Sequence, residues 1–245
     1  MSMRWWPFRK RQTLAESGIF RGMTDYHAHL LPGVDDGVQT AEESLEILRL
    51  YEQLGIREVW CTPHVMEDIP NTTAGLRARF GQFQACYAGP VRLHLAAEYM
   101  LDNLFKERLA HRDLLPLGAE GDHLLVETSY FNPPMDLYGM VEKIKSAGYI
   151  PVLAHPERYV YMGEADYRRL KERGVKFQSN LPSLVGAYGN PVQKKAEWLQ
   201  VEKLVNLYGT DTHTFPSFQR IISFRALYIE IERLYIDGGV EFEVR

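Results

Sequence analysis

The stretch Thr24-Asp25-Tyr26-His27-Ala28-His29-Leu30 begins the repeated pattern that decides the fold of this chain. It starts as a strand-like run and ends in two histidines separated by one residue. Because alternate residues of a β-strand share a face, His27 and His29 can point at one metal ion. A His-x-His pair alone more often consists of two structural histidines. The ends of the other predicted strands distinguish between these two interpretations.

Short apolar runs alternate with longer helical patterns from residue 23 onward. The runs predict seven strands, at residues 23–26, 58–62, 92–97, 123–127, 150–154, 175–178 and 204–209. Helical patterns occupy residues 40–54, 73–87, 137–147, 165–173 and 193–203. Repeated strand-helix units require parallel strands covered by helices. This number of units in 245 residues favours a single-domain α/β fold with a closed or nearly closed barrel.

Local signals refine this outline. Thr40 is the predicted N-cap of the first helix, and Glu43 is expected to complete a capping box. Residues 67–79 and the Asn132-Pro133-Pro134 turn are predicted to form loops over the mouth of the barrel. Residues 218–235 are predicted to form a final amphipathic helix that closes the barrel.

The composition is that of an ordinary globular protein, with 45% hydrophobic and 24% charged residues. The 28 cationic and 32 anionic side chains give a net charge of −4, which provides no general attraction to nucleic acid. Two cysteines, Cys61 and Cys86, cannot form a disulfide framework. No stretch has the pattern of a signal peptide or a membrane span. We therefore expect a cytoplasmic location.

The first 22 residues are expected to form a basic and aromatic extension to a domain of residues 23–245. Residues 1–11 mix cationic side chains with aromatic ones, among them Trp5 and Trp6. Such a segment can touch an anionic membrane face or a partner, which would bring the chain close to a membrane. A loose terminal extension is the simpler expectation.

Side chains of the metal-binding type follow six of the seven predicted strands. Each taken singly has an ordinary structural explanation, but packing does not require nitrogen and oxygen ligands at the same end of successive strands. Barrel active sites assemble at the carboxyl ends of strands, so the joint arrangement predicts a metal site there. The residues are His27, His29, His64, Glu98, Glu127, His155, Asp211 and His213.

The number of candidate ligands indicates more than one ion. Five histidines and several carboxylates exceed what one four-coordinate ion uses, so we expect two or three ions that share a bridging carboxylate. Nitrogen and carboxylate ligands without thiolate suit manganese, iron or zinc, and the sequence does not choose among them. The loop Asp35-Asp36-Gly37 offers one more ligand, although it is also typical of a simple turn.

Several motifs occur together and in order. They are His27-Ala28-His29, Leu31-Pro32-Gly33-Val34-Asp35-Asp36-Gly37, Thr62-Pro63-His64, Ala97-Glu98-Tyr99, His155-Pro156-Glu157-Arg158 and Thr210-Asp211-Thr212-His213. Together they resemble the polymerase-and-histidinol-phosphatase (PHP) superfamily, and more narrowly its bacterial metal-dependent protein-tyrosine phosphatases of CpsB/YwqE type. This resemblance implies a distorted (β/α)7 TIM-like barrel that carries a trinuclear metal site.

The resemblance also implies a role for each residue at a matching position. The implied ligands are His27, His29, Glu98 and Asp211 for the first ion, with Glu98 bridging to a second ion held by Glu127 and His155, and Asp36, His64 and His213 for the third. Arg158 falls on the family's phosphate-binding arginine. Arg220 is the nearest candidate for a second family arginine, but it lies further along the chain than the family spacing. His213 is also a candidate to assist the leaving group.

The implied activity is hydrolysis of phosphotyrosine in proteins by in-line attack of a metal-bridging hydroxide. The implied partner is a membrane tyrosine autokinase with a tyrosine-rich cytoplasmic tail, in capsule or exopolysaccharide regulation. Two alternatives stay open. One is a small-molecule phosphatase of histidinol-phosphatase type, because a fold does not fix its substrate. The other is a catalytically silent metal-binding barrel that docks a kinase.

A second phosphatase signature competes with the metal interpretation. Cys86 and Arg92 match the Cys-x5-Arg spacing of cysteine-based tyrosine phosphatases. However, Pro90 removes one of the N–H donors that such a loop needs, Cys86 falls on a predicted helix, and Arg92 starts a strand rather than a helix. We therefore expect Cys86 to be a small buried apolar residue.

Overall fold

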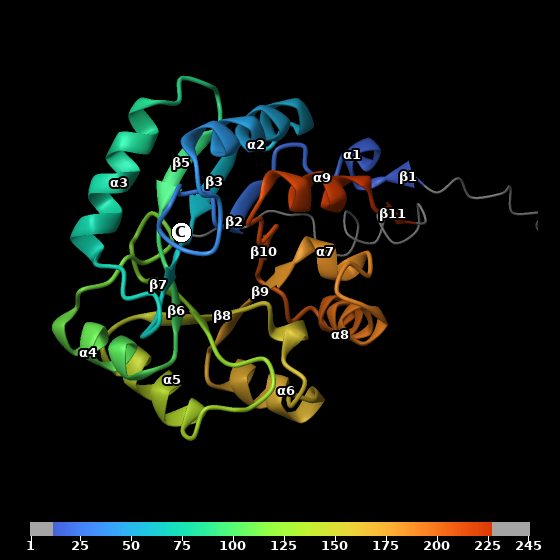
Figure 1. Ribbon diagram of the computed structural model, residues 1–245. Coiled ribbons are helices and arrows are strands. Elements are labelled where there is room, and N and C mark those ends of the chain that lie inside the picture. The colour runs from blue at the N-terminus through green and yellow to red at the C-terminus, as the bar shows by residue number, and fades with distance from the viewer. Residues whose placement is uncertain (1–11, 227–245) are drawn as a thin grey trace, which may run out of the picture.

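The computed structural model describes residues 12–226 and contains parallel sheets surrounded by helices (Figure 1). The strands are β1 (Gln12–Thr13), β2 (Thr24–Ala28), β3 (Glu58–Cys61), β4 (His64–Val65), β5 (Arg92–Leu95), β6 (Glu98–Met100), β7 (His123–Glu127), β8 (Ile150–Ala154), β9 (Lys176–Asn180), β10 (Leu207–Gly209) and β11 (Arg225–Ala226). One parallel sheet has the order β10-β9-β8-β7-β6-β4 and the other β2-β3-β5. The strands β1 and β11 form a separate antiparallel pair.

Hydrogen bonds join the two parallel sheets along the seam between β10 and β2. The Asp211 N–H donates to the His27 carbonyl at 2.8 Å, and the His29 N–H donates to the Thr212 carbonyl at 2.9 Å. The buried Asp25 carboxylate adds to the seam by accepting hydrogen bonds from elements on both sides of it. The strands thus curl into a half-barrel within one α/β domain.

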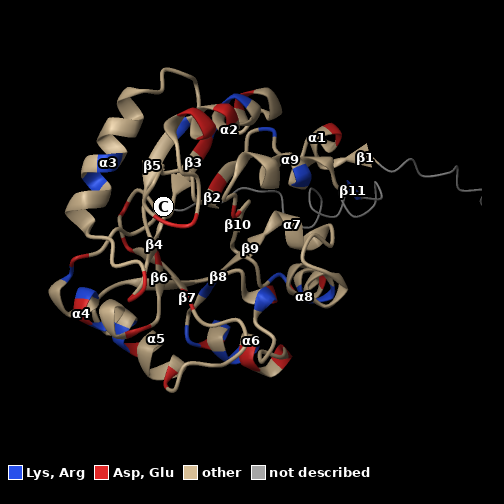
Figure 2. Ribbon diagram, viewed as in Figure 1, with Lys and Arg blue, Asp and Glu red and all other residues tan. Residues whose placement is uncertain are grey.

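Helices follow most strands and cover the outside of the curled sheet (Figure 1). They are α1 (Leu14–Ser17), α2 (Ala41–Leu54), α3 (Thr73–Ala85), α4 (Asn103–His111), α5 (Leu137–Ser146), the 3-10 helix η1 (Pro156–Arg158), α6 (Glu164–Glu172), α7 (Leu181–Leu184), α8 (Asn190–Val201) and α9 (Phe215–Ser223). Cationic and anionic residues are interspersed over the outer helices (Figure 2). Among the described residues, no helix is both long and apolar enough to cross a membrane.

The helix α2 shows how sequence signals set an element in place. The Thr40 hydroxyl accepts a hydrogen bond from the Glu43 N–H at 3.2 Å, as expected of the N-cap. The Glu43 side chain, however, accepts from the Phe215 N–H at 2.8 Å, so it ties α2 to the start of α9. The helix ends at Leu54 and is capped by Gly55, whose φ of 82° favours glycine.

Most predicted elements are present, and the strands β7 and β8 have the predicted bounds. Two predicted strands are interrupted by short breaks, after which the chain passes from the sheet of β3 and β5 to the other parallel sheet, as β4 at His64 and as β6 at Glu98. The second break arises because the Ala97 N–H donates to the Leu115 carbonyl at 3.1 Å, whereas the Glu98 N–H donates to the Pro63 carbonyl. Glu98 therefore begins a short strand rather than following a continuous one.

The last predicted helix and one predicted loop are wrong in their bounds. The helix α9 begins at Phe215 and ends at Ser223, and β11 follows it, so the helix does not continue from residue 218 to 235. It starts early because the Thr214 hydroxyl caps it by accepting from the Ser217 N–H. Residues 227–235 lie outside the described residues. The loop predicted at residues 67–79 gives way to α3 because Thr72 acts as an N-cap.

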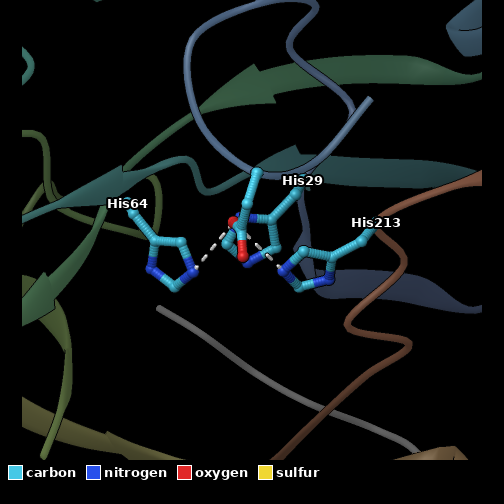
Figure 3. Close-up of side chains that lie close together, drawn as sticks. His29, His64 and His213 are labelled. Carbon is cyan, nitrogen blue, oxygen red and sulfur yellow. Dashed lines mark ion pairs between the residues drawn. The ribbon is translucent and has the colours of Figure 1, made fainter. Parts of the chain in front are cut away.

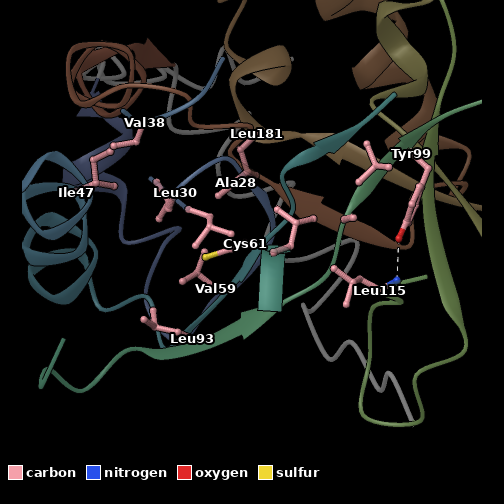
Figure 4. Packing of buried hydrophobic residues seen from close by; sticks show 14 of the residues in the cluster. Ala28, Leu30, Val38, Ile47, Val59, Cys61, Leu93, Tyr99, Leu115 and Leu181 are labelled. Atoms are coloured by element: carbon pink, nitrogen blue, oxygen red, sulfur yellow. Dashed lines mark hydrogen bonds between the residues drawn. The ribbon is translucent and has the colours of Figure 1, made fainter. Parts of the chain in front are cut away.

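The main hydrophobic core lies between the sheet and the helices packed on it. Figure 4 shows side chains from β2, β3 and α2, such as Ala28, Val59 and Ile47, packed together in this core. Leu14 and Phe20 belong to the same cluster and are almost fully buried. The described part of the expected N-terminal extension, residues 12–22, therefore packs against the domain that follows it.

Candidate metal centre

Most candidate ligands gather where the parallel strands end, as the sequence predicts, whereas His64 and Glu98 begin the short strands β4 and β6. Two of them, His155 and Asp211, have φ angles of 33° and 53°. Non-glycine residues adopt this left-handed region at a cost, and such strain is common at functional sites. These conformations turn the chain sharply just beyond β8 and β10, so that both side chains stay at the end of the sheet.

The first group contains His27, His29, Glu98 and Asp211. The Nε2 atom of His27 lies 3.1 Å from the Nε2 atom of His29 and 3.2 Å from Glu98 Oε2. Asp211 Oδ1 lies 3.6 Å from both of these Nε2 atoms. Two ring nitrogens that face each other and two carboxylates can act as ligands of one ion.

Glu98 connects this group to a second one. Its Oε1 lies 3.0 Å from His155 Nε2, and its Oε2 lies 3.2 Å from His64 Nδ1. Glu127 completes the second group, with Oε1 3.1 Å from His64 Nδ1 and Oε2 3.8 Å from His155 Nε2. One carboxylate thus lies between two groups of nitrogen atoms, which is the position of a bridging ligand. His64, expected at the third ion, contacts the second group as well.

The third group is the most open to solvent. Asp36 Oδ1 lies 3.5 Å from His64 Nε2 and 3.7 Å from His213 Nε2 (Figure 3). The rings of His29 and His213 stack with centroids 4.0 Å apart, which brings this group against the first. The Asp36 side chain is 66% exposed, whereas Glu98 is buried. A cation held here would keep more contact with water than one held at the first group.

The charges in this cluster strongly shift the pKa values of its histidines and carboxylates. Burial alone would lower the pKa of His27, but the charges of Glu98 and Asp211 outweigh it and raise this pKa to about 9. Burial would also lower the pKa of His29. Hydrogen bonds to Asp35 and Glu98 outweigh burial and hold this pKa well above its usual value. Burial raises the pKa of Glu98, but the surrounding histidines outweigh it and hold this pKa well below its usual value. The site therefore combines concentrated negative charge with several ring nitrogens.

The residues present fit metal ions. His64 Nδ1 and Glu127 Oε1 are buried, and neither has a hydrogen-bond partner although they lie 3.1 Å apart. Buried polar atoms without partners are rare, and a shared cation would satisfy both. Among the described residues there are three sets in which all the ligand atoms of a set lie within 4.8 Å of one another. The sets are His29, Asp36, His64 and His213; His27, His29 and Glu98; and His64, Glu98 and Glu127.

Two residues with no predicted role hold the first histidines in place. Asp35 Oδ2 accepts a hydrogen bond from His29 Nδ1–H at 2.8 Å and another from the His64 backbone N–H at 3.0 Å. Burial raises the pKa of Asp35, but these bonds outweigh it and lower the pKa to about 2. Gln178 Oε1 lies 2.7 Å from His27 Nδ1. The sequence indicated for Asp35 only a turn whose loop could offer a ligand, and it gave no signal for Gln178.

The Arg158 guanidinium is fixed beside the first group. Its Nη1 donates to Asp211 Oδ2 at 2.8 Å. Its Cζ lies over the rings of Tyr130 and Tyr188, 4.2 Å and 4.7 Å from their centroids. Two aromatic faces and one carboxylate thus restrain a side chain that is otherwise flexible.

A cavity of about 260 Å³ opens next to this arginine. Arg158 and Arg220 both line it, together with Asp211, His213 and Tyr188. The structure thus brings Arg220 to the site despite its unexpected spacing in the sequence. The cavity joins the candidate metal centre to a partly aromatic wall, so it has room for a group attached to a phosphate.

The Cys-x5-Arg segment lies elsewhere and forms no phosphate-binding loop. Cys86 follows α3, and its Sγ donates to the Gln82 carbonyl at 3.3 Å. Arg92 begins β5 and pairs with Glu58. Cys86 is exposed, so the expectation of a buried cysteine is wrong, because the end of α3 where it lies faces solvent.

A curled parallel α/β fold that gathers histidines and carboxylates at one end of its strands defines a class, that of half-barrel proteins whose clustered side chains could bind metal ions. Within this class the chain belongs to the family described as capsular polysaccharide synthesis, CpsB/CapC, whose model matches residues 23–230. This finding confirms the resemblance expected from the motifs.

Individual relatives are similar over most of their length. The tyrosine-protein phosphatase YwqE of Bacillus subtilis (strain 168) is 28% identical over 213 residues, which cover 84% of this chain and 83% of the relative. The tyrosine-protein phosphatase CpsB of Streptococcus pneumoniae is 27% identical, with 80% and 84% covered. A crystal structure from work on YwqE and CpsB, described as unique metal-dependent tyrosine phosphatases, matches with a TM-score of 0.76 at 26% identity, covering 90% of this chain and 89% of that one.

Proposed function

We propose that this chain is a metal-dependent phosphatase that hydrolyses phosphotyrosine in proteins. The observation that carries the proposal is the position of Glu98, whose carboxylate oxygens lie 3.2 Å, 3.2 Å and 3.0 Å from ring nitrogens of His27, His64 and His155. A preorganised arginine, Arg158, lies beside this cluster. The family relatives called tyrosine-protein phosphatases support the choice of substrate class.

We assign the ligands by the groups they form. The proposed sets are His27, His29, Glu98 and Asp211 for a first ion, Glu98, Glu127 and His155 for a second, and Asp36, His64 and His213 for a third. Contacts of His64 to Glu98 on one side and to Asp36 on the other support a position between the second and third ions. Manganese, iron and zinc all suit such nitrogen and oxygen ligands.

The protein's own residues bind and orient the phosphate. Divalent ions, when bound, neutralise phosphate oxygens and acidify a water that can attack phosphorus. Arg158 presents further N–H groups beyond the one engaged by Asp211, and these suit the non-bridging oxygens. Arg220, on the wall of the same cavity, adds a second positive charge, and His213 is the proposed group to assist the leaving oxygen.

The cavity supports an aromatic leaving group. Its wall includes Tyr188, Ile221 and Phe224, against which a phenyl ring can pack. A phenolate also leaves more readily than an alkoxide, so a tyrosine ester needs less help from an acid. We extend the proposal to the tail of a membrane tyrosine kinase as substrate and to a cytoplasmic location. We also propose that the basic and aromatic residues 1–11 dock this partner.

We also propose that the domain is a distorted (β/α)7 barrel. If β3 with β4 and β5 with β6 each count as one interrupted strand, the parallel strands number seven. The hydrogen bonds between the chain after β10 and the end of β2 support closure of the ring.

A substrate panel tests the proposed activity. Metal-loaded protein should hydrolyse a phosphotyrosine peptide with a higher kcat/KM than a phosphoserine peptide or histidinol phosphate, and His29→Ala should abolish turnover. A preference for histidinol phosphate would assign the chain to the small-molecule phosphatases. Metal-replete protein that is inert toward all three substrates would indicate a silent docking barrel.

A further inference from the structure

The strand β9 provides none of the expected metal ligands, yet it ends at the centre of the site. Two amide side chains, Gln178 and Asn180, lie on alternate positions of this strand and are fully buried. Burying two amides is unfavourable unless each finds hydrogen-bond partners. Their partners are therefore informative about their purpose.

The amides form a continuous chain of hydrogen bonds between two proposed ligands of the first ion. Asn180 Nδ2 donates to Asp211 Oδ2 at 2.8 Å. Gln178 Nε2 donates to Asn180 Oδ1 at 2.9 Å and to the Ser179 carbonyl at 3.0 Å. Gln178 Oε1 lies 2.7 Å from His27 Nδ1.

The direction of every bond in this chain follows from the carboxylate at its end. An ionised carboxylate only accepts, so Asn180 must turn its NH₂ group toward Asp211 and its oxygen toward Gln178. Gln178 must then present its NH₂ group to Asn180 and its oxygen to His27. That oxygen also accepts from the His155 N–H at 3.4 Å, and toward His27 it can only accept. The proton of the neutral His27 ring therefore lies on Nδ1 and the lone pair on Nε2.

We propose that Gln178 and Asn180 are positioning residues that fix His27 with its proton on Nδ1, so that Nε2 is directed at the first metal ion. Nε2 of His27 faces Glu98 and the second oxygen of Asp211, which agrees with this role. The inference rests on the metal centre of the proposed function but not on the substrate.

The two histidines of the His-x-His pair are thus held by different means. His29 donates to the Asp35 carboxylate, whereas His27 donates to a neutral amide. The amide orients the ring without adding another negative charge to a site that already contains Glu98 and Asp211. Partners of this kind on metal-binding histidines typically change metal affinity by about 10–100-fold.

Metal binding without substrate tests the proposal. The affinity of metal-free protein for Zn²⁺ is measured by competition with a chromophoric chelator for the wild type, Gln178→Leu, Asn180→Leu and the double variant. We expect Gln178→Leu to weaken the tightest site by about 10–100-fold. The double variant should lose less than the product of the single effects, because both residues act through one chain. Gln193→Leu is the control, since that amide bonds to Leu184 and Glu197 and touches no proposed ligand.

A spectroscopic measurement separates positioning from a general effect on folding. In zinc-loaded protein labelled with ¹⁵N-histidine, His27 should show a protonated Nδ1 and a metal-bound Nε2, with the signal assigned by its absence in His27→Gln. The conservative variant Gln178→Glu keeps an acceptor, so it should preserve this pattern and shift the Nδ1–H proton. Wild-type zinc affinity in Gln178→Leu, or an unshifted His27 proton in Gln178→Glu, would overturn the proposal. Failure to hydrolyse phosphotyrosine would leave both readouts intact.

Discussion

Replacing Gly209 with alanine would displace the His27 side chain while leaving every proposed ligand residue in the sequence. A Cβ atom built on Gly209 lies 2.5 Å from His27 Cβ, which is 0.9 Å short of the 3.4 Å at which ordinary contact begins. It also lies 2.9 Å from both the His27 backbone nitrogen and Gln178 Nε2, so the histidine has little room to retreat. A misplacement of about 1 Å near reacting groups can cost roughly 100-fold in rate. We therefore expect Gly209→Ala to lower kcat/KM by about that factor.

The assay is turnover of a phosphotyrosine peptide by metal-loaded protein, with metal content and thermal unfolding measured on the same samples. The control is Gly81→Ala, because a Cβ at Gly81 in α3 has no atom within 4 Å. This control should retain full activity and gain up to about 1 kcal/mol of stability from its helix position. Wild-type turnover by Gly209→Ala would refute the reasoning that close packing against β10 places His27.

Three further predictions concern other parts of the molecule. Arg158→Lys keeps a positive charge but loses the planar guanidinium fork. We therefore expect kcat/KM on a phosphotyrosine peptide to fall roughly 100-fold while the metal content stays unchanged. An unaffected rate would show that Arg158 does not bind the phosphate. Cys86→Ser should leave turnover unchanged, since Cys86 is exposed at the end of α3, and complete loss of turnover would favour a cysteine mechanism. In metal-free protein, the raised pKa of His27 contributes stability below about pH 6.5 that is lost as the pH rises through about 9. Urea unfolding should therefore show a loss on the order of 3 kcal/mol between pH 6 and pH 9, and His27→Gln should lack this part of the pH dependence.

The parallel strands were predictable because their physical signal is strong and local. The strands β7 and β8 are largely buried, so β8 is a continuous apolar run and β7 has one at residues 124–126 between His123 and Glu127, and their predicted bounds are correct. The two-residue strand β4 has no such run, and it exists because β6 offers backbone partners beside it. The helix α4 was missed for a related reason. Its short segment is rich in polar residues, and its position depends on the Asp102 cap.

The candidate site was predictable where a residue type itself indicates metal chemistry. Histidines and acids at successive strand ends are distinctive, and the structure brings all of those predicted into one cluster. Gln178 and Asp35 could not be assigned roles, because an amide or a turn acid gains its meaning only from the partner that the fold places opposite it. The prediction that Cys86 is buried failed for a different reason. It relied on the general preference of cysteine for burial, whereas Cys86 lies at the solvent-facing end of a helix and is exposed.

The most direct test of the central claim is stepwise reconstitution of phosphotyrosine hydrolysis. Protein stripped of metal by a chelator is titrated with Mn²⁺, and turnover of a phosphotyrosine peptide is recorded at each addition. We expect no turnover by the stripped protein and full recovery only after about two to three equivalents, because Glu98 joins ligand groups that must be filled together. Full activity of the stripped protein would contradict this expectation.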